Sequence, residues 1–121
     1  MSDLGFAAQL AEDLTPEDLR LVLGVFRTDV ERLTGALSMA IAAADIVAFR
    51  RAAHGLAGAA GAVGAVRLEQ ACRQAMADAV PMDQAHAEID ALAAGALGDL
   101  AAFLVRLDLP PLDPPSLDPA S

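Results

Sequence analysis

The chain has 121 residues, of which 55% are hydrophobic and 3% aromatic, with no tryptophan and no tyrosine. This composition is typical of one folded domain, and the many alanines favour close-packed helices over sheets, which need β-branched and aromatic side chains. The formal net charge of -9 repels a phosphate backbone, so nucleic acid is excluded as an expected ligand.

Three further classes of protein are excluded by what the chain lacks. Cys72 is the single cysteine, so no intramolecular disulfide can form, and the first ten residues have no signal-peptide pattern; we expect a cytoplasmic protein. The longest uncharged run, 52–66, would make a helix of about 22 Å, too short to insert through a hydrocarbon core of about 30 Å. Because there is no lysine, a Walker-type phosphate loop is also excluded.

The first strong element is a long amphipathic helix that begins after Thr15. Thr15 is suited to cap its first turn, and Pro16 to occupy its first position. Apolar residues then recur every three or four positions along one stripe: Leu19, Leu23, Phe26, Val30, Leu33, Leu37 and Ile41. A short helix over residues 4–12 is expected to precede it and to pack on the same core.

Three more helices are predicted from apolar residues that recur at helical spacing. Asp45 is expected to cap a helix over 46–61, a second helix over 65–80 ends at Pro81 because proline cannot continue it, and the last runs over about 83–107. Short links between such helices predict an all-α protein, an antiparallel four-helix bundle with a short extra N-terminal helix. We expect a monomer, although the same apolar stripes would also suit a dimer interface.

The helical domain is predicted to span residues 1–107, followed by a flexible Pro-rich tail over 108–121. The stretch "LDLPPLDPPSLDPAS" carries five of the seven prolines and loosely repeats Leu-Asp-x-Pro. This composition is typical of an extended, solvated terminus. A peptide that docks on a partner is the alternative.

His54 stands alone in the alanine- and glycine-rich stretch "RRAAHGLAGAAGAVGA". At about 100° per residue, Leu56, Phe49 and Val63 fall on the opposite side, so His54 is expected to point away from the core. Its own side is predicted to carry Val47, Arg50, Arg51, Ala57, Gly58 and Gly61. A glycine inside a helix costs about 1 kcal/mol relative to alanine, which is offset where a macromolecular partner must approach closely. The alternative is an ordinary surface histidine beside glycines that serve packing.

The same residues resemble the signature of histidine-containing phosphotransfer (Hpt) domains, approximately A-H-x-L-K-G-x-x-x-x-x-G-A-x-x-L-x-x-x-C. Eight positions fall in register without a gap: Ala53, His54, Leu56, Gly58, Gly64, Ala65, Leu68 and Cys72. The resemblance covers about residues 15–105. It implies a four-helix bundle in which Nε2 of His54 accepts a phosphoryl group from the aspartate of a receiver domain, or donates it to one.

The resemblance further implies a phosphocarrier rather than an enzyme, with a sensor histidine kinase and the receiver domain of a response regulator as partners. Mg²⁺ is expected on the receiver, with no metal or other cofactor on this chain. Ala57 departs from the pattern, because the family has a lysine there that helps to neutralise the phosphoryl group. Arg50 and Arg51, one turn before His54, are candidates to replace it. Otherwise the domain is a weak carrier, or a bundle that regulates a receiver or kinase without being phosphorylated.

A second departure concerns the next helix. The family often has a glutamine there that hydrogen-bonds the histidine Nδ1, and the comparable residue is about Met76, which cannot do so. Arg73 and Gln70 lie nearby as possible substitutes.

The remaining reactive side chains indicate no site of their own. His86 has no partner residue at metal-ligand spacing, and Cys72 falls on the apolar face of its helix, where an inert thiol is expected. No pair of carboxylates is placed for acid–base work. A self-contained enzyme is therefore the third hypothesis, after the carrier and the binding module.

Overall fold

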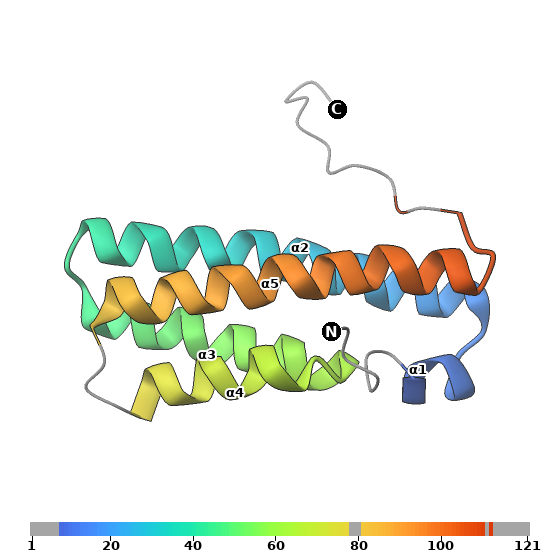
Figure 1. Cartoon of the computed structure of the whole chain (residues 1–121), viewed down its shortest axis with the longest axis horizontal. Helices are drawn as coiled ribbons and strands as arrows, with labels where there is room; N and C mark the ends of the chain where they lie inside the picture. Colours follow the sequence, from blue (N-terminus) through green and yellow to red (C-terminus); the bar gives the residue numbers. More distant parts are fainter. Residues whose placement is uncertain (1–7, 78–80, 111, 113–121) are drawn as a thin grey trace, which may run out of the picture.

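The computed structural model describes residues 8–77, 81–110 and 112 of the chain. Its helices are α1 Ala8–Asp13, α2 Pro16–Ala42, α3 Ile46–Val63, α4 Val66–Ala77 and α5 Met82–Arg106. Helices α2 to α5 pack lengthwise into a bundle, and the short α1 lies at one end of it (Figure 1). The predicted all-α bundle with a short N-terminal helix is confirmed, whereas residues 4–7 and 78–80 of the predicted helices lie outside the described residues.

Two helix starts are capped by the residues that the sequence indicates. Oγ1 of Thr15 accepts a hydrogen bond from the backbone N–H of Asp18 at 3.1 Å. Oδ1 of Asp45 accepts one from the backbone N–H of Ala48 at 3.0 Å. Each bond satisfies a donor that the first turn of a helix leaves without a partner. At the other end of α3, Gly64 has a φ of 76°, a left-handed conformation that glycine adopts without steric cost.

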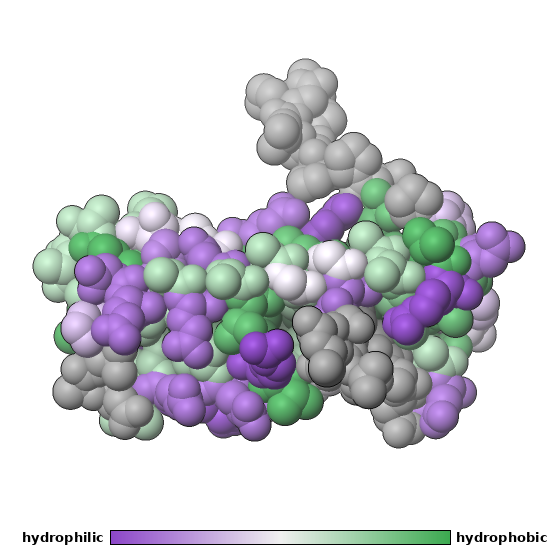
Figure 2. All heavy atoms as spheres, in the orientation of Figure 1, coloured by the Kyte–Doolittle hydropathy of each residue, from purple (hydrophilic) through white to green (hydrophobic). Residues whose placement is uncertain are grey.

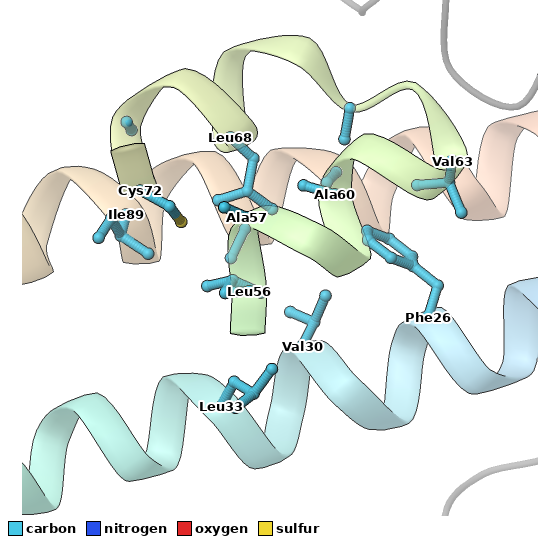
Figure 3. Packing of buried hydrophobic residues seen from close by; sticks show 14 of the residues in the cluster. Phe26, Val30, Leu33, Leu56, Ala57, Ala60, Val63, Leu68, Cys72 and Ile89 are labelled. Atoms are coloured by element: carbon cyan, nitrogen blue, oxygen red, sulfur yellow. The ribbon is translucent and has the colours of Figure 1, made fainter. Parts of the chain in front are cut away.

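One apolar core lies between the helices (Figure 3). The stripe on α2 is buried as predicted from Leu19 to Leu37, and at its end Ala40 is buried while Ile41 is only partly buried. These two positions follow Leu37 by three and four residues, so both border the stripe. The largest fully buried side chains are Phe49, Leu23, Leu37, Leu56, Leu68, Ile89, Val30 and Cys72.

The order of packing places α3 and α5 at opposite corners of the bundle. Helix α3 packs against α2 and α4, and α5 packs against the same two helices. None of the helices in the described ranges is long and apolar enough to cross a membrane.

Beyond α5 the chain continues along a groove between α2 and α5. Leu109 and Leu112 are partly buried against the core, and together with Arg27 and side chains of α5 they line a hollow of about 280 Å³. The packed part of the chain thus extends to Leu112, past the predicted domain boundary at residue 107, because these leucines bury apolar surface. The rest of the predicted tail, 111 and 113–121, lies outside the described residues.

Candidate functional site

His54 lies in the middle of α3 and is exposed to solvent. The buried residues of the same helix are Phe49, Ala52, Ala53, Leu56, Ala57, Ala60 and Val63. Among the described residues, the imidazole has no hydrogen-bond or ion-pair partner. The predicted orientation of His54 is confirmed, and no described side chain occupies its ring nitrogens.

The surface of α3 around His54 is cationic. Arg50 and Arg51 are exposed, and α3 contains no acidic residue, whereas each of the other four described helices contains at least one. Within the described part of the chain, neither arginine forms an ion pair. They precede His54 by four and three residues, the spacings at which side chains meet on a helix surface. An anionic group on His54 would therefore lie within reach of both guanidinium groups.

Ala57 lies in the core and not on the bare side of the helix where it was predicted. It is 2% exposed and lies next to Leu68 of α4 (Figure 3). The prediction was wrong because α3 is covered by two neighbours, α2 and α4, so that a position only about 60° from His54 is still covered. Position 57 therefore contributes packing to the site and no cation.

Gly58 and Gly61 are both exposed on the side of His54, but their surroundings differ. A Cβ at Gly58 would meet nothing within 4 Å. A Cβ at Gly61 would stand 3.1 Å from Oε2 of Glu69 on α4. The predicted bare surface is thus found at Gly58, whereas the missing side chain of Gly61 lets a carboxylate of the next helix pack against α3.

Arg73 is engaged with Glu69 and not with the histidine. Its Nη2 and Nε donate to Oε2 of Glu69 at 2.7 Å and 3.1 Å. Neither Arg73 nor Gln70 forms the predicted hydrogen bond to Nδ1 of His54, because a helical side chain leans toward the N-terminus of its own helix, and for Arg73 this is the direction of Glu69. The substitution of Arg73 or Gln70 for the family glutamine is therefore not found.

Met76 stands at the level of His54 on the neighbouring helix. Gly61 lies against Glu69, which sets the register of α3 against the antiparallel α4. His54 precedes Gly61 by seven residues and Met76 follows Glu69 by seven, about two turns along each helix. The α4 side chain at this level is thus a thioether, which has no hydrogen-bond donor.

A hollow of about 190 Å³ between α2 and α3 adjoins the exposed face of α3 that carries His54. Apart from Asp29 it is lined by apolar side chains: Val22, Val25 and Phe26 of α2, and Ala59, Ala62 and Val63 of α3. Val25 is 61% exposed, and Leu21, one turn earlier, is 66% exposed. Sequence reasoning followed the buried stripe and missed this surface; the available signal was two large apolar residues of α2 outside that stripe.

The other two candidate nucleophiles are shielded. Cys72 is fully buried, and this burial raises the pKa of its thiol to about 12, so the thiol is inert as predicted. Nε2 of His86 lies 3.4 Å from Oδ2 of Asp90, so the expectation that no partner residue stands at ligand spacing from His86 was wrong: Asp90 follows it by one helical turn. In the ranges 8–77, 81–110 and 112, no three His, Cys, Asp or Glu side chains lie close enough together to hold a metal ion.

Comparison with known proteins identifies one family. The family model of the Hpt domain matches residues 21–107, which include His54 and nearly all of the four long helices. No curated protein and no solved structure matches the chain. The match therefore extends over the whole bundle and not only over the motif around His54.

Proposed function

The chain belongs to the Hpt domain family, and on that premise we propose that it is a phosphorelay carrier in which His54 exchanges a phosphoryl group with the aspartate of a receiver domain. Hpt domains are phosphocarriers rather than enzymes, and they interact with receiver domains and kinases. The observation that carries the proposal is an exposed His54 on a helix with two arginines and no acidic residue.

The proposed chemistry exchanges one bond for another. The neutral imidazole attacks the phosphorus atom of the receiver's aspartyl phosphate through the lone pair of Nε2. The Nε2–P bond forms while the bond between phosphorus and the aspartate oxygen breaks, and the aspartate leaves as a carboxylate. Donation from His54 to a receiver follows the same path in reverse, so neither direction needs an oxidant or a reductant.

Arg50 and Arg51 are proposed to neutralise the phosphoryl group on His54. Phosphoryl transfer depends mainly on positioning and on stabilisation of charge. Because a helical side chain leans over the turn before it, the imidazole is directed toward the turn that holds these arginines. The receiver domain is proposed to supply Mg²⁺ and its own acidic pocket, which the cationic surface of α3 would face.

The receiver domain is proposed to cover the apolar surface beside His54. Its aspartyl phosphate must come within bonding distance of Nε2, so the partner has to bury the surrounding residues as well. Ala59 and Ala62 of the hollow follow His54 by five and eight residues, which is within about 12 Å along α3. Together with the exposed Val25, they offer apolar area at the edge of the cationic surface.

The direct test is phosphorylation by a receiver. The purified protein is mixed with each phosphorylated receiver domain of the same cell in the presence of Mg²⁺, and the transferred label is tested for acid lability. We expect acid-labile label on the native protein and on the control His86→Gln, and none on His54→Gln. Label that persists on His54→Gln would refute the assignment of the acceptor.

A second candidate function is favoured by the two departures at this site. Ala57 is buried and Met76 stands at the level of the imidazole, so two groups that the family resemblance led us to expect are missing. The bundle would then bind a receiver or a kinase and regulate it without being phosphorylated. In that case no receiver labels the protein, and His54→Gln leaves the partner complex intact.

A further inference from the structure

We propose that residues 113–121 dock on the outer face of α2, in a groove over Leu21 and Gly24, and thereby cover the apolar surface beside the cationic face of α3. The docking itself does not depend on the proposed function. Its consequence, competition with a receiver domain, does rest on that function.

Leu112 leads the chain to this groove. It lines the hollow of about 280 Å³ between α2 and α5, which Leu109 also lines. It also lines a second hollow of about 330 Å³ over Leu21 and Gly24 on the outer side of α2. The described part of the chain therefore ends, at Leu112, in the second hollow, and residues 113–121 continue from there in the sequence.

The groove is continuous, with apolar side chains along its middle and charged ones, Glu17, Arg20, Arg27 and Asp29, at its sides. A third hollow of about 400 Å³ shares Leu21 and Gly24 with the second and extends to Val25. Leu21 and Val25 are 66% and 61% exposed, and a Cβ at Gly24, between them in the sequence, would meet nothing within 4 Å. Two large apolar side chains beside a bare glycine form a trough that an extended peptide can fill.

Residues 113–121 repeat the unit that already packs on the bundle. Leu112-Asp113 is followed five residues later by Leu117-Asp118, with prolines between them. Five residues of polyproline conformation span about 15 Å, and this conformation loses little entropy on docking. Leu117 therefore reaches Leu21 from the anchored Leu112, which lines the same hollow as Leu21.

The groove offers two cations to the two carboxylates of the segment. Arg20 and Arg27 both line the second and third hollows, about 10 Å apart along α2, while Glu17 lines only the second and Asp29 only the third. The only charged side chains of residues 113–121 are Asp113 and Asp118. A tether of a few residues also holds the segment at millimolar effective concentration, which favours the chain's own tail over that of a second copy.

Disulfide trapping in the full-length chain tests the docking. In one variant Leu21→Cys is combined with Leu117→Cys, and in the matched control Val105→Cys is combined with Leu117→Cys. Val105 is 77% exposed and lines a hollow with Leu112, so the tether offers it a similar chance of contact. The native Cys72 is buried and takes no part.

We expect the pair at 21 and 117 to form an intrachain disulfide at least ten times faster than the control pair in dilute solution. Equal rates for the two pairs, or no disulfide in either, would overturn the proposal. A disulfide that forms only between chains would assign the groove to a second copy and overturn it as well.

The regulatory consequence has its own measurement. Leu117→Glu removes the apolar anchor, and Ala120→Glu adds the same charge three residues away without removing it. We expect Leu117→Glu to accept phosphoryl groups from a receiver several times faster than the native chain, and Ala120→Glu to match the native rate. If no receiver labels any of these chains, the proposed function fails while the disulfide result still decides the docking.

Discussion

The two histidines of this chain lie at opposite corners of the bundle, in surroundings of opposite charge. His54 on α3 is exposed, with Arg50 one turn before it and no acidic residue on its helix. The side chain of His86 on α5 is 21% exposed, and its Nε2 lies 3.4 Å from a carboxylate oxygen of Asp90. Hydrophilic side chains gather over this half of α5 and along α4 (Figure 2).

The difference teaches that neighbouring charges, rather than the imidazole itself, decide which histidine suits a phosphoryl group. A phosphoryl group adds a charge of about -1.5 to -2, which Arg50 would attract and Asp90 would repel. In addition, Nε2 of His86 already has a partner, whereas no described residue occupies the ring of His54.

The largest expected effect is on the free energy of unfolding, and it comes from Cys72, whose thiol the bundle buries between the two helices that carry the histidines. Burial raises the pKa of its thiol from 9.0 to about 12. Above pH 9 the thiol ionises in the unfolded chain but not in the folded one, so the free energy of unfolding falls as the pH rises toward 12, by roughly 4 kcal/mol in all. No lysine or tyrosine titrates in this window, because the chain has neither.

Urea unfolding between pH 8 and pH 11.5 measures this effect. The native chain should lose stability steadily above pH 9, whereas Cys72→Ala, although less stable at every pH because of the cavity it leaves, should show a nearly flat profile. Parallel profiles for the two chains would mean that the thiol is not the group that titrates.

The next effect is obtained by giving His54 the surroundings of His86. Arg50→Glu places a carboxylate four residues before His54, at the same spacing as in the pair of His86 and Asp90 but in the opposite order along the helix. We expect transfer from a phosphorylated receiver to slow by more than tenfold, which corresponds to about 1.4 kcal/mol or more.

Arg67→Glu is the matched control for Arg50→Glu. It makes the same change of charge at an exposed position near the start of α4, and it should change the rate by less than threefold. If both variants slow transfer equally, overall charge and not the position of Arg50 governs the reaction.

A smaller effect is expected on the affinity for the receiver domain, and it shows which side of α2 faces this partner. Val25 is 61% exposed beside α3, and Val105 is 77% exposed near the end of α5. Val25→Glu should weaken binding of the receiver domain about tenfold, because a charge would have to be buried against the partner. Val105→Glu should leave the dissociation constant unchanged, as measured by calorimetry with the unphosphorylated receiver; a tenfold change there would move the docking surface to α5.

The smallest effect compares bare glycines on the two histidine helices. A Cβ at Gly58 on α3 or at Gly98 on α5 would meet nothing within 4 Å, so alanine at either position should raise the free energy of unfolding by roughly 0.5–1 kcal/mol. Gly58→Ala should also slow transfer to His54 by a fewfold, whereas Gly98→Ala should not. Equal transfer rates would show that the glycine serves no approach to the histidine.

Much of this fold follows from local sequence. Thr15 and Asp45 indicate where α2 and α3 begin, because a side-chain oxygen there accepts a backbone hydrogen bond from the same helix. This bond does not depend on tertiary structure. The apolar stripe of α2 and the outward direction of His54 follow from a constant rotation per residue. The motif around His54 also predicted the family, whose domain model matches residues 21–107.

Other features depend on neighbours that are distant in the sequence. The rotation per residue gives the centre of the buried face of a helix but not the width of that face. Ala57 is part of the core because α2 and α4 both pack against α3 and together cover a wider face. The space above Gly61 is filled by Glu69, which also engages Arg73 and so removes it as a partner for the imidazole. Only the register of two helices decides such contacts.

The sequence alone thus determined the all-α class, the helix starts, the exposure of His54 and the arginines one turn before it, because each depends on spacing within one helix. Tertiary structure alone decided that Glu69 packs over Gly61, that Val25 and Ala62 line one hollow, and that Leu112 reaches the outer face of α2. These features join residues of different helices, and packing of the whole bundle sets their distance.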